Sequence, residues 1–398
     1  MITSHVTVSD LYNLANQALR SNVHRFTPPP AWSQSHSADF GEIWFPSIGC
    51  AWWENGSCNM CNYGASISPT PEQMIQAVAL SLASFDSVPG VLWVSAFDNL
   101  DRRDVPVEVR HQIYRLLANS NAHTIISESY PSIVSFNKVK ECVELLPGKQ
   151  FVVEIGVEST NDLLRTWCIH KNFTNDHIQR AIIQTKQAGA EIYINLLVGI
   201  PFLTMDESID DAVSSVKESF EAGADSVVIF PCHIKENTLY YWLYQHGIFQ
   251  PPSLWVIVET ILRSNPKYWS RIKLAWLETK NHPGSSASIK PTIDYENEEE
   301  FMSCLMEFNE IGDGEILRPL LNSSSYSKWR SDISLPAKDS TQNRIAQILP
   351  RIGIELLDGT WWAEHGEYIL QLLMSDWDSQ YLSVSTGGGS PLRPGNAA

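Results

Sequence analysis

IWFPSIGCAWWENGSCNMCNYG (residues 43–64) joins an apolar, strand-like segment directly to a loop that holds three cysteines. The first six residues, 43–48, are rich in isoleucine and aromatic side chains, as expected for a buried strand. Cys50, Cys58 and Cys61 follow, separated by seven and then two residues. Three thiols in one loop after a strand, with no fourth cysteine nearby, favour an iron–sulfur site in which one iron stays open to a ligand.

Two other interpretations of the three cysteines stay open. A structural zinc ion takes four protein ligands, so zinc would need His36 or an acidic residue as the fourth. Three buried structural cysteines would suit an apolar loop, whereas this loop is polar and contains glycine. The position of the loop favours the open cluster, because the chemistry of parallel α/β proteins collects at the C-terminal ends of their strands.

Five further strand-like segments follow the first and alternate with helical patterns. They are too apolar to be half-solvated, which is typical of a buried parallel sheet. Six βα units predict an α/β fold, a partial (β/α)6 TIM-like barrel or an open sheet. The strands are expected at 43–48, 91–97, 123–129, 151–158, 191–200 and 226–231, and the helices at 10–20, 69–85, 106–118, 136–146, 174–188 and from Ile209 to a stop at Gly223.

The alternation weakens beyond about residue 235, and this change sets the domain boundaries. A helical stretch rich in Trp and Tyr (238–264) leads to a candidate strand at 271–278 and then to a break rich in Pro, Gly and Ser. We therefore expect four parts: an N-terminal lead (1–40), the partial barrel (41–280), a mainly helical extension (281–384) and a disordered tail (385–398).

Composition and charge limit the function classes. The 398 residues include 45 acidic and 28 basic side chains, which gives a net charge of −17. A field of that sign repels phosphate backbones and argues against a general nucleic-acid binder. The odd number of cysteines, seven, does not suggest a secreted disulfide framework. Neither a signal peptide nor a membrane span is visible, so we expect a soluble cytoplasmic protein.

The cysteine loop and several later segments resemble the radical S-adenosylmethionine (SAM) enzymes. Most of that family has a shorter first cysteine spacing. The longer spacing seen here, followed by Asn-Tyr-Gly, is similar to the branch of the archaeosine-forming radical SAM subunit and, more distantly, of the elongator catalytic subunit. The similarity covers roughly residues 40 to 280 and includes SAFDNLDRRDVPVEVR (95–110), IISESYPSIVSFNKV (125–139), EIGVESTNDLLRTWCIHKNFT (154–174), LLVGIPFLTMDESIDDA (196–212) and residues 231–255.

The resemblance implies a set of cofactors and ligands. Cys50, Cys58 and Cys61 would bind three irons of a [4Fe–4S] cluster, and SAM would chelate the fourth. An electron from a donor such as flavodoxin or ferredoxin would cleave SAM to a 5′-deoxyadenosyl radical, which abstracts hydrogen from a substrate. The residues expected to contact SAM follow successive strands: Tyr63 beside the adenine, Ser95, Ala96 and Phe97, Glu128, Glu158, Lys171 with Arg165 as its rival, and Asn195.

Side-chain alternation predicts which of these residues face the barrel lumen. Glu154 and Glu158 share one side of the fourth strand by the period of two. Carboxylates find no partners in helix packing, so this side is expected to face the lumen. Asn195 is a polar group in a buried strand and needs a partner, which is either a ligand or a hydrogen bond within the core. The alternative role for the charged residues is an ordinary surface or ion-pair position.

The remaining cysteines and one histidine are weaker candidates for function. Cys232 follows the sixth strand, where its thiol could donate a hydrogen atom, bind a second metal group or stay inert in the core. His233, next to it, is a candidate for proton transfer. Cys168 lies on the loop after the fourth strand. Cys142 and Cys304 fall within helical patterns and are expected to be structural.

The substrate is predicted from departures from the archaeosine-type relatives. Those relatives act with a partner on tRNA and tend to carry extra cysteines after the barrel, whereas residues 277–291 contain none. Together with the net charge, this favours a small-molecule substrate, such as a nucleoside or sugar intermediate of natural-product biosynthesis. Two alternatives are kept: a tRNA-modifying radical SAM subunit that acts with a partner, and a non-catalytic zinc or cluster scaffold.

Overall fold

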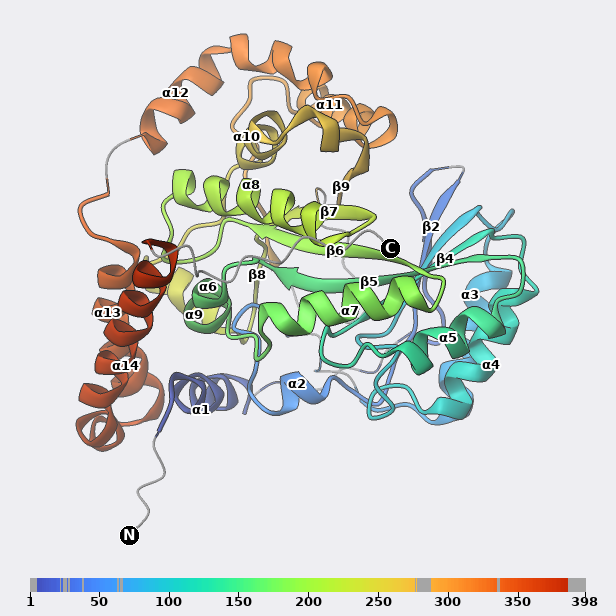
Figure 1. Cartoon of the computed structure of the whole chain (residues 1–398), viewed down its shortest axis with the longest axis horizontal. Coiled ribbons are helices and arrows are strands. Elements are labelled where there is room, and N and C mark those ends of the chain that lie inside the picture. The colour runs from blue at the N-terminus through green and yellow to red at the C-terminus, as the bar shows by residue number, and fades with distance from the viewer. Residues whose placement is uncertain are drawn as a thin grey trace.

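A curved, eight-stranded sheet forms the centre of the protein (Figure 1). The computed structural model describes residues 6–385 except 22, 24–26, 28, 38, 63, 65, 66, 276, 278–287, 335 and 336. The strands of the sheet follow the order β1 (Ser33–Ser35), β2 (Phe40–Trp44), β3 (Val91–Ser95), β4 (Thr124–Ser129), β5 (Gln150–Glu158), β6 (Glu191–Val198), β7 (Ser226–Pro231) and β9 (Ile272–Leu274). All are parallel except β1, which pairs antiparallel with β2 at one edge.

Helices cover the convex face of this half-barrel, as the βα alternation predicts. The covering helices are α3 (Pro71–Ala83), α4 (Val107–Ala118), α5 (Phe136–Leu145), α7 (Asn175–Gln187), α8 (Met205–Ala222) and α10 (Trp255–Arg263). Two of these helices have the predicted capping residues at their ends. Thr70 caps α3 in a capping box with Pro71 in the first turn, and α8 stops at Gly223, whose φ is +108°.

The strand prediction differs from the structure at both ends of the sheet. β2 ends at Trp44, before the expected stop at residue 48, and Pro46 has no N–H with which to continue the ladder. The candidate strand at 271–278 is real over Ile272–Leu274, where it pairs with β7 as a seventh parallel strand. The half-barrel therefore has one more parallel strand than predicted.

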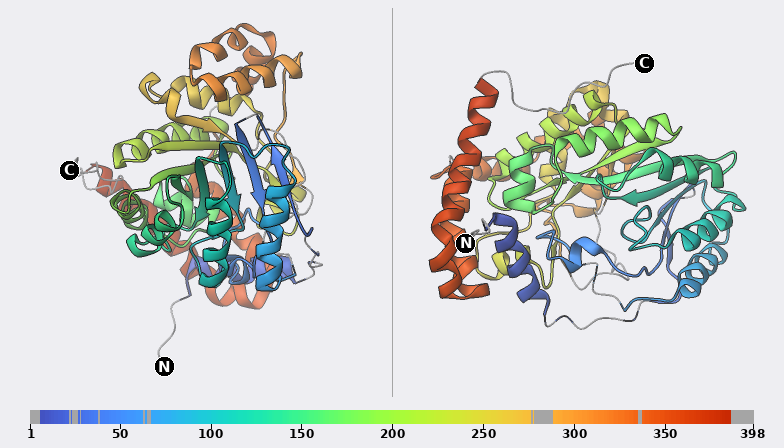
Figure 2. Two further views of the ribbon diagram at one scale, coloured as in Figure 1. Left: turned by 90° about the vertical axis from the view of Figure 1, so that its right-hand side faces the viewer. Right: turned by 60° about the horizontal axis from the view of Figure 1, so that its bottom comes forward.

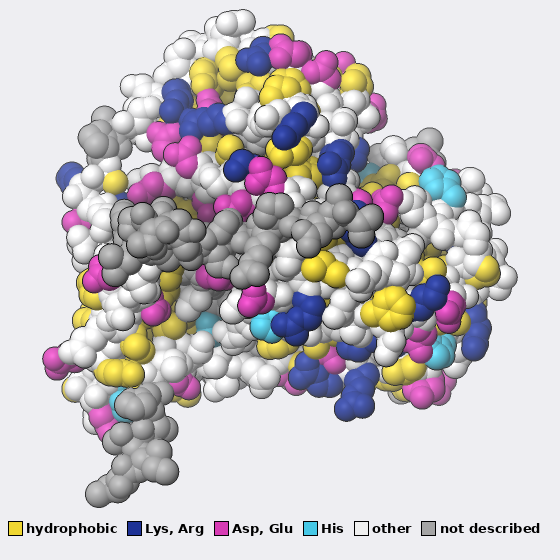
Figure 3. Space-filling view, in the orientation of Figure 1, with side chains coloured by type: hydrophobic (Ala, Val, Ile, Leu, Met, Phe, Trp, Pro, Cys, Tyr) yellow, Lys and Arg dark blue, Asp and Glu magenta, His cyan; other side chains and the backbone are white. Residues whose placement is uncertain are grey.

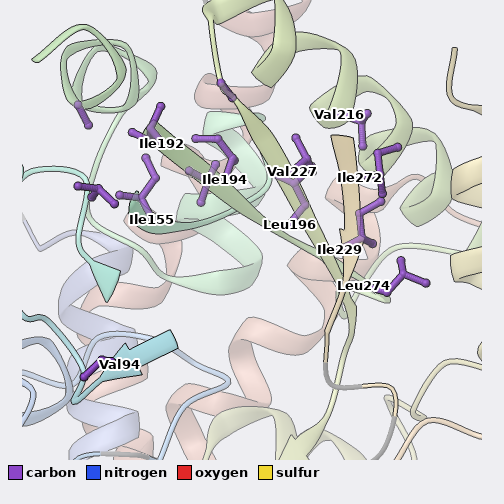
Figure 4. Packing of buried hydrophobic residues seen from close by; sticks show 14 of the residues in the cluster. Val94, Ile155, Ile192, Ile194, Leu196, Val216, Val227, Ile229, Ile272 and Leu274 are labelled. Atoms are coloured by element: carbon purple, nitrogen blue, oxygen red, sulfur yellow. The ribbon is translucent and has the colours of Figure 1, made fainter. Parts of the chain in front are cut away.

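The main core lies between the sheet and the helices on its convex face. Val153, Ile155 and Val157 of β5 are fully buried in it, as their alternation predicts. Figure 4 shows the same side of β6 and β7 filled by Ile192 and Ile194 together with Val227 and Ile229. The opposite, concave face is the lumen, where polar side chains such as Glu154 and Asn195 lie among apolar ones such as Val152.

A second core lies at the end of the sheet toward which β5 points (Figures 1 and 2). Its apolar residues come from both ends of the chain, from Leu197 of β6 and from the segments that follow β5, β6 and β7. The contributing elements are α1 (Val8–Arg20), the π-helix at Arg165–Ile169, α9 (Leu239–Gln245), α13 (Thr341–Ile352) and α14 (Gly359–Ser385).

The C-terminal extension is helical, as predicted, but its two halves pack in different places. The first half packs on α10 and β9 and consists of α11 (Glu298–Ile311), a 3-10 segment (Gly314–Asn322) and α12 (Ser324–Ile333). The second half, α13 and α14, packs against α1 in the second core. Nearly all of the expected tail, 386–398, lies outside the described residues.

Two short helices and a small second sheet complete the fold. α2 (Ala51–Glu54) and α6 (Asp162–Leu164) lie in the loops after β2 and β5, and a small separate sheet pairs β8 (Ile234–Lys235) with β10 (Ser288–Ile289). In the described part of the chain, no helix combines the length and apolar character that a membrane crossing requires.

Candidate active site

The cysteine loop is docked on the segment that follows β5. Cys50 precedes α2 as its N-cap, and Cys58 has a left-handed backbone with φ of +63°. This conformation is costly for a residue with a Cβ atom and needs support from its surroundings. The support comes from two backbone hydrogen bonds, in which the N–H groups of Cys58 and Asn59 donate to the carbonyls of His170 and Ile169, each at 2.9 Å.

Helix α1 holds the other side of this loop through Arg20. The buried guanidinium of Arg20 donates to four loop carbonyls, those of Trp53, Ser57 (2.8 Å), Cys58 (3.0 Å) and Cys61 (3.3 Å). Arg20 therefore fixes the loop on which all three cysteines depend.

The contact between α1 and the loop is very close. Asn16 Nδ2 donates to the carbonyl of Gly56 at 2.8 Å. A Cβ atom on Gly56 would lie 2.4 Å from the carbonyl oxygen of Asn13, and Gly56 has φ of +85°. Glycine is thus required at this position for both space and backbone conformation.

The three cysteines lie near enough to one another to interact electrostatically. Burial raises the pKa of Cys50 well above its usual range, and repulsion from Cys58 and Cys61 adds to this. Burial also raises the pKa of Cys58 to about 11, although Lys171 and Arg20 oppose the shift. Within the described residues, no group of three or more Cys, His, Asp or Glu side chains is arranged to hold a metal ion.

A buried ion pair lies beside the cysteines at the end of β5. Lys171 Nζ donates to Glu158 Oε1 at 2.5 Å and to the carbonyl of Gly156 at 2.7 Å. Burial opposes the charge on Lys171, but Glu158 and Cys58 raise its pKa, so the ammonium is favoured. Glu158 follows a bulge in the ladder and has φ of +67°. Its second oxygen, Oε2, is buried and has no hydrogen-bond partner among the described residues.

The structure separates the two basic residues that the sequence offered as rivals. Arg165 is completely buried and its guanidinium is occupied by the loop that follows β5, where it bonds to the Ser159 carbonyl, Asp162 and Asn175. Lys171, in contrast, interacts electrostatically with Cys58 and Cys61. Of the two, only Lys171 lies beside the cysteines.

Polar side chains of neighbouring strands meet on the lumenal face below this pair. Glu128 and Glu154 are register partners in β4 and β5. Ser95 Oγ donates to Glu128 Oε2 at 2.5 Å, and Asn195 Nδ2 donates to Glu154 Oε1 at 2.8 Å. Burial raises the pKa of Glu128 to about 8 and that of Glu154 to about 7, so both carboxyl groups can hold a proton near neutral pH. Asn195 Oδ1 is buried without a hydrogen-bond partner among the described residues.

Lys235 is a lumenal residue that the sequence analysis missed. It lies on β8 and is buried, and burial lowers its pKa to about 7, against the opposing effects of Cys61 and Glu128. It therefore lies between the cysteine loop and the lumenal carboxyl groups. Its only signal in the sequence was its place in the segment 231–255 of the family resemblance.

The other predicted residues lie at varied distances from this centre. Cys232 and His233 are buried after β7, and Cys232 interacts electrostatically with Glu158 and Lys235. Phe97 meets Trp44 edge to face, with ring centroids 6.4 Å apart. Tyr63 lies outside the described residues.

The remaining cysteines lie in apolar surroundings. Cys168 is buried in the second core, Cys142 is buried on the inner face of α5, and Cys304 is half-buried on α11. Within the cysteine loop, Trp52 stacks on Tyr130 with ring centroids 4.1 Å apart.

Two similar proteins are archaeosine synthase beta subunits from archaea. That of Thermococcus kodakarensis is 31% identical over 234 residues, which cover 57% of this chain and 72% of the relative. That of Methanosarcina acetivorans is 28% identical over 224 residues, which cover 54% of this chain and 64% of the relative, slightly less than two thirds of its length. No protein-family model matches the chain.

Solved structures with a similar fold include an archaeal Elp3 and a porphyrinogen oxidase. The Elp3 of Methanocaldococcus infernus aligns with a TM-score of 0.44 and 14% identity over 74% of this chain and 64% of that chain. Coproporphyrinogen III oxidase of Escherichia coli, a radical SAM enzyme, aligns with a TM-score of 0.39 and 14% identity over 62% of this chain and 53% of that chain.

Proposed function

Since this chain belongs to the radical SAM enzymes, in the family of the archaeosine synthase beta subunits, we propose that it is the radical SAM subunit of a two-subunit enzyme that modifies a nucleoside of tRNA. The observation that carries the proposal is the 31% identity to the Thermococcus subunit over 72% of its length. The relatives' name, a beta subunit, supports a partner chain. The similarity thus favours the tRNA alternative over the small-molecule substrate expected from charge.

We propose that Cys50, Cys58 and Cys61 hold the [4Fe–4S] cluster that radical SAM enzymes bind. The donor set fits this group, because one loop carries three thiols and two buried cations, Arg20 and Lys171, lie where thiolate charge would be. When bound, the cluster and SAM supply a 5′-deoxyadenosyl radical that abstracts a hydrogen atom from the substrate.

The neighbouring residues would bind and orient SAM. The ammonium of Lys171 suits the SAM carboxylate, and the free Oε2 of Glu158 suits an N–H or O–H donor of SAM. Lower in the lumen, Glu128 and Asn195 offer further acceptor atoms. The burial of these groups excludes water and strengthens each polar contact to a ligand.

The small-molecule hypothesis keeps one specific observation in its favour. The net charge of −17 repels RNA as a whole, so a tRNA-acting chain must either concentrate its cations locally or use the RNA-binding surface of its partner. A small substrate would need neither.

Anaerobic reconstitution tests the proposed cofactors. The wild-type chain should take up iron and, with a reductant, release 5′-deoxyadenosine from SAM. Cys58→Ala should lose both properties. Cys304→Ala, a matched change of a half-buried cysteine on α11, should keep them. A wild-type chain that binds no iron and cleaves no SAM would support the scaffold alternative instead.

A second assay tests the substrate. Release of 5′-deoxyadenosine by the loaded enzyme is measured under three conditions. The enzyme receives tRNA, tRNA together with candidate partner subunits, or a pool of nucleosides and sugar derivatives. The proposal predicts that release rises with tRNA. Stimulation by the small-molecule pool alone would overturn the tRNA proposal and leave the radical SAM assignment intact.

A further inference from the structure

A pocket of about 310 Å³ lies on the loop after β4, next to the candidate active site. Its lining comes from the residues between β4 and α5, from the first turn of α5 and from α7, and it includes Lys138, His177 and Arg180 but no acidic side chain. In a chain with 45 acidic residues, a pocket lined by only basic and neutral side chains is a local reversal of charge.

Lys138 and Arg180 of this pocket form no ion pair with any described residue. Lys138 Nζ donates to the Ile133 carbonyl at 3.0 Å, and no carboxylate lies within ion-pair distance of it in the described part of the chain. Arg180 is exposed, and its guanidinium makes no hydrogen bond or ion pair with any described residue. The hydroxyl groups of Ser132 and Ser135 also line the pocket. Together these groups can offer positive charge and hydrogen-bond donors to an anion.

The positive charge continues across the rim of the half-barrel. Arg102 and Arg103 are exposed on the neighbouring loop, which follows β3, and Arg103 also forms an ion pair with Asp101 at 2.5 Å. The Arg103 guanidinium lies 5.8 Å from the ring centroid of Trp52 in the cysteine loop. Figure 3 shows Lys and Arg side chains gathered on the lower part of the face that carries α7. Arg102 and Arg103 after β3, Lys138 on α5 and Arg180 on α7 thus form a basic strip.

One residue, Tyr130, connects this strip to the proposed cofactor site. Tyr130, which directly precedes the pocket, stacks on Trp52, and its ring centroid lies 5.7 Å from Lys171 Nζ. Its hydroxyl accepts a hydrogen bond from the N–H of Asn172 at 3.1 Å. An extended polyanion held in the pocket would therefore pass the mouth of the lumen.

We propose that the pocket at Lys138, His177 and Arg180 binds a backbone phosphate of the RNA substrate and positions the neighbouring nucleotides at the lumen. The proposal rests on the proposed function, because it takes the substrate to be RNA. Phosphate contacts of this kind set the register of a nucleic acid on a protein without reading its bases. A free phosphate or nucleotide would use the same chemistry, but it would not need the further cations at Arg102 and Arg103.

Binding of a transcribed tRNA to the full-length chain tests the pocket. Affinity is measured by fluorescence anisotropy at several KCl concentrations for wild type and for Lys138→Gln/Arg180→Gln. We expect the double variant to bind about tenfold more weakly and the magnitude of the slope of log K against log[salt] to fall by roughly one, for the single phosphate that the pocket holds. Lys217→Gln on α8, which removes a charge from an exposed ion pair with Glu221, should bind like wild type.

Three outcomes would overturn the proposal. The double variant could bind tRNA with wild-type affinity and salt dependence, the wild-type chain could fail to bind tRNA, or inorganic phosphate could bind at Arg180 while tRNA does not compete with it. None of these outcomes touches the proposed function, which depends on tRNA-stimulated release of 5′-deoxyadenosine. Release without added tRNA should be equal in wild type and the double variant, which shows that the active site is intact.

Discussion

Among the described side chains outside the cysteine loop, Arg20 makes the largest number of hydrogen bonds to it. Its guanidinium bonds to four loop carbonyls from a buried position. Arg20→Met should destabilise the apoprotein by roughly 2–3 kcal/mol, because several carbonyls lose a charged donor at once. It should also lower the iron bound after reconstitution. Thermal unfolding and iron analysis measure the two effects.

Arg20→Lys separates the fork geometry of arginine from its charge. Lysine keeps the charge but cannot span carbonyls on both sides of the loop, so its iron content should fall between those of wild type and Arg20→Met. Equal iron content in all three proteins would show that the loop does not depend on this contact.

Gly156 leaves room for the Lys171–Glu158 pair. A Cβ atom at this position would lie 2.8 Å from Lys171 Nζ and 3.0 Å from Glu158 Oε1. Gly156→Ala should displace the ends of these side chains rather than unfold the protein, and it should weaken SAM binding about tenfold, the equivalent of roughly one charge-assisted hydrogen bond. Calorimetry with the iron-loaded protein measures this. Gly359→Ala, where a Cβ atom meets nothing within 4 Å, is the control.

Asp211 on α8 should make folding depend on pH. Burial raises its pKa to about 7, although Ser159 and Arg165 oppose the shift. Between about pH 4 and pH 7 the folded chain keeps a proton that the unfolded chain releases, so this carboxyl lowers stability as pH rises through that range. The stability of Asp211→Asn relative to wild type should therefore increase as the pH rises from 5 to 8. Unfolding of both proteins across this range measures the difference.

Asp210→Asn is the matched control on the same helix. Asp210 is exposed and forms an ion pair with Arg263 at 3.1 Å, so its removal should not produce the same trend. A constant difference between Asp211→Asn and wild type over the whole pH range would contradict the buried protonated state.

The polar residues of the site differ in how far the sequence could predict them. The lumenal side of Glu154 followed from strand alternation alone, because the opposite side of β5 is entirely apolar. The choice between Lys171 and Arg165 depended on the path of the loop after β5, which short-range patterns do not specify. Arg20 and Lys235 reach the site only through tertiary packing of α1 and β8, so no local pattern marked them.

At the scale of secondary structure, local sequence patterns predict where helices and strands form, but they do not predict which elements pack against one another. Capping residues and buried strands gave the six βα units, and Pro46 explains the early end of β2. The short strand β9 has three residues and is recognisable mainly because β7 offers it a free edge. The split of the extension between α10 and α1 likewise depends on which apolar faces remain uncovered after the sheet has formed.

Helix α14 packs on the second core, and the contrast between two neighbouring residues of this helix can test that packing. Leu373 is fully buried there, whereas its neighbour Met374 is exposed. Leu373→Ala should cost about 2–5 kcal/mol of stability, because it removes buried methyl groups and leaves a cavity. Met374→Ala should change stability by less than about 0.5 kcal/mol. Urea unfolding of both variants measures the contrast, and equal stabilities would mean that α14 does not pack as described.

On the scale of the whole molecule, the two cores differ in how they are built. The main core joins consecutive βα units, whose strands pair along a continuous ladder. The second core joins α1 at one end of the chain to α13 and α14 at the other, and the large sheet adds only a few side chains to it, such as the buried Leu197 of β6. Contacts between such distant segments add stability but no local hydrogen-bond ladder, so the second core should open at a lower free energy than the first.

Hydrogen exchange should reveal this order of opening. Amides of α1, α13 and α14 are expected to exchange together and faster than those of β5 and β6. Leu373→Ala should speed exchange in α1 and in the cysteine loop, because Arg20 transmits the loosening of α1 to the carbonyls of Trp53, Ser57 and Cys58. Exchange in β5 and β6 should stay unchanged. If the variant accelerated all segments equally, the molecule would open as one unit, and the cysteine loop would owe its order to the sheet rather than to the packed ends of the chain.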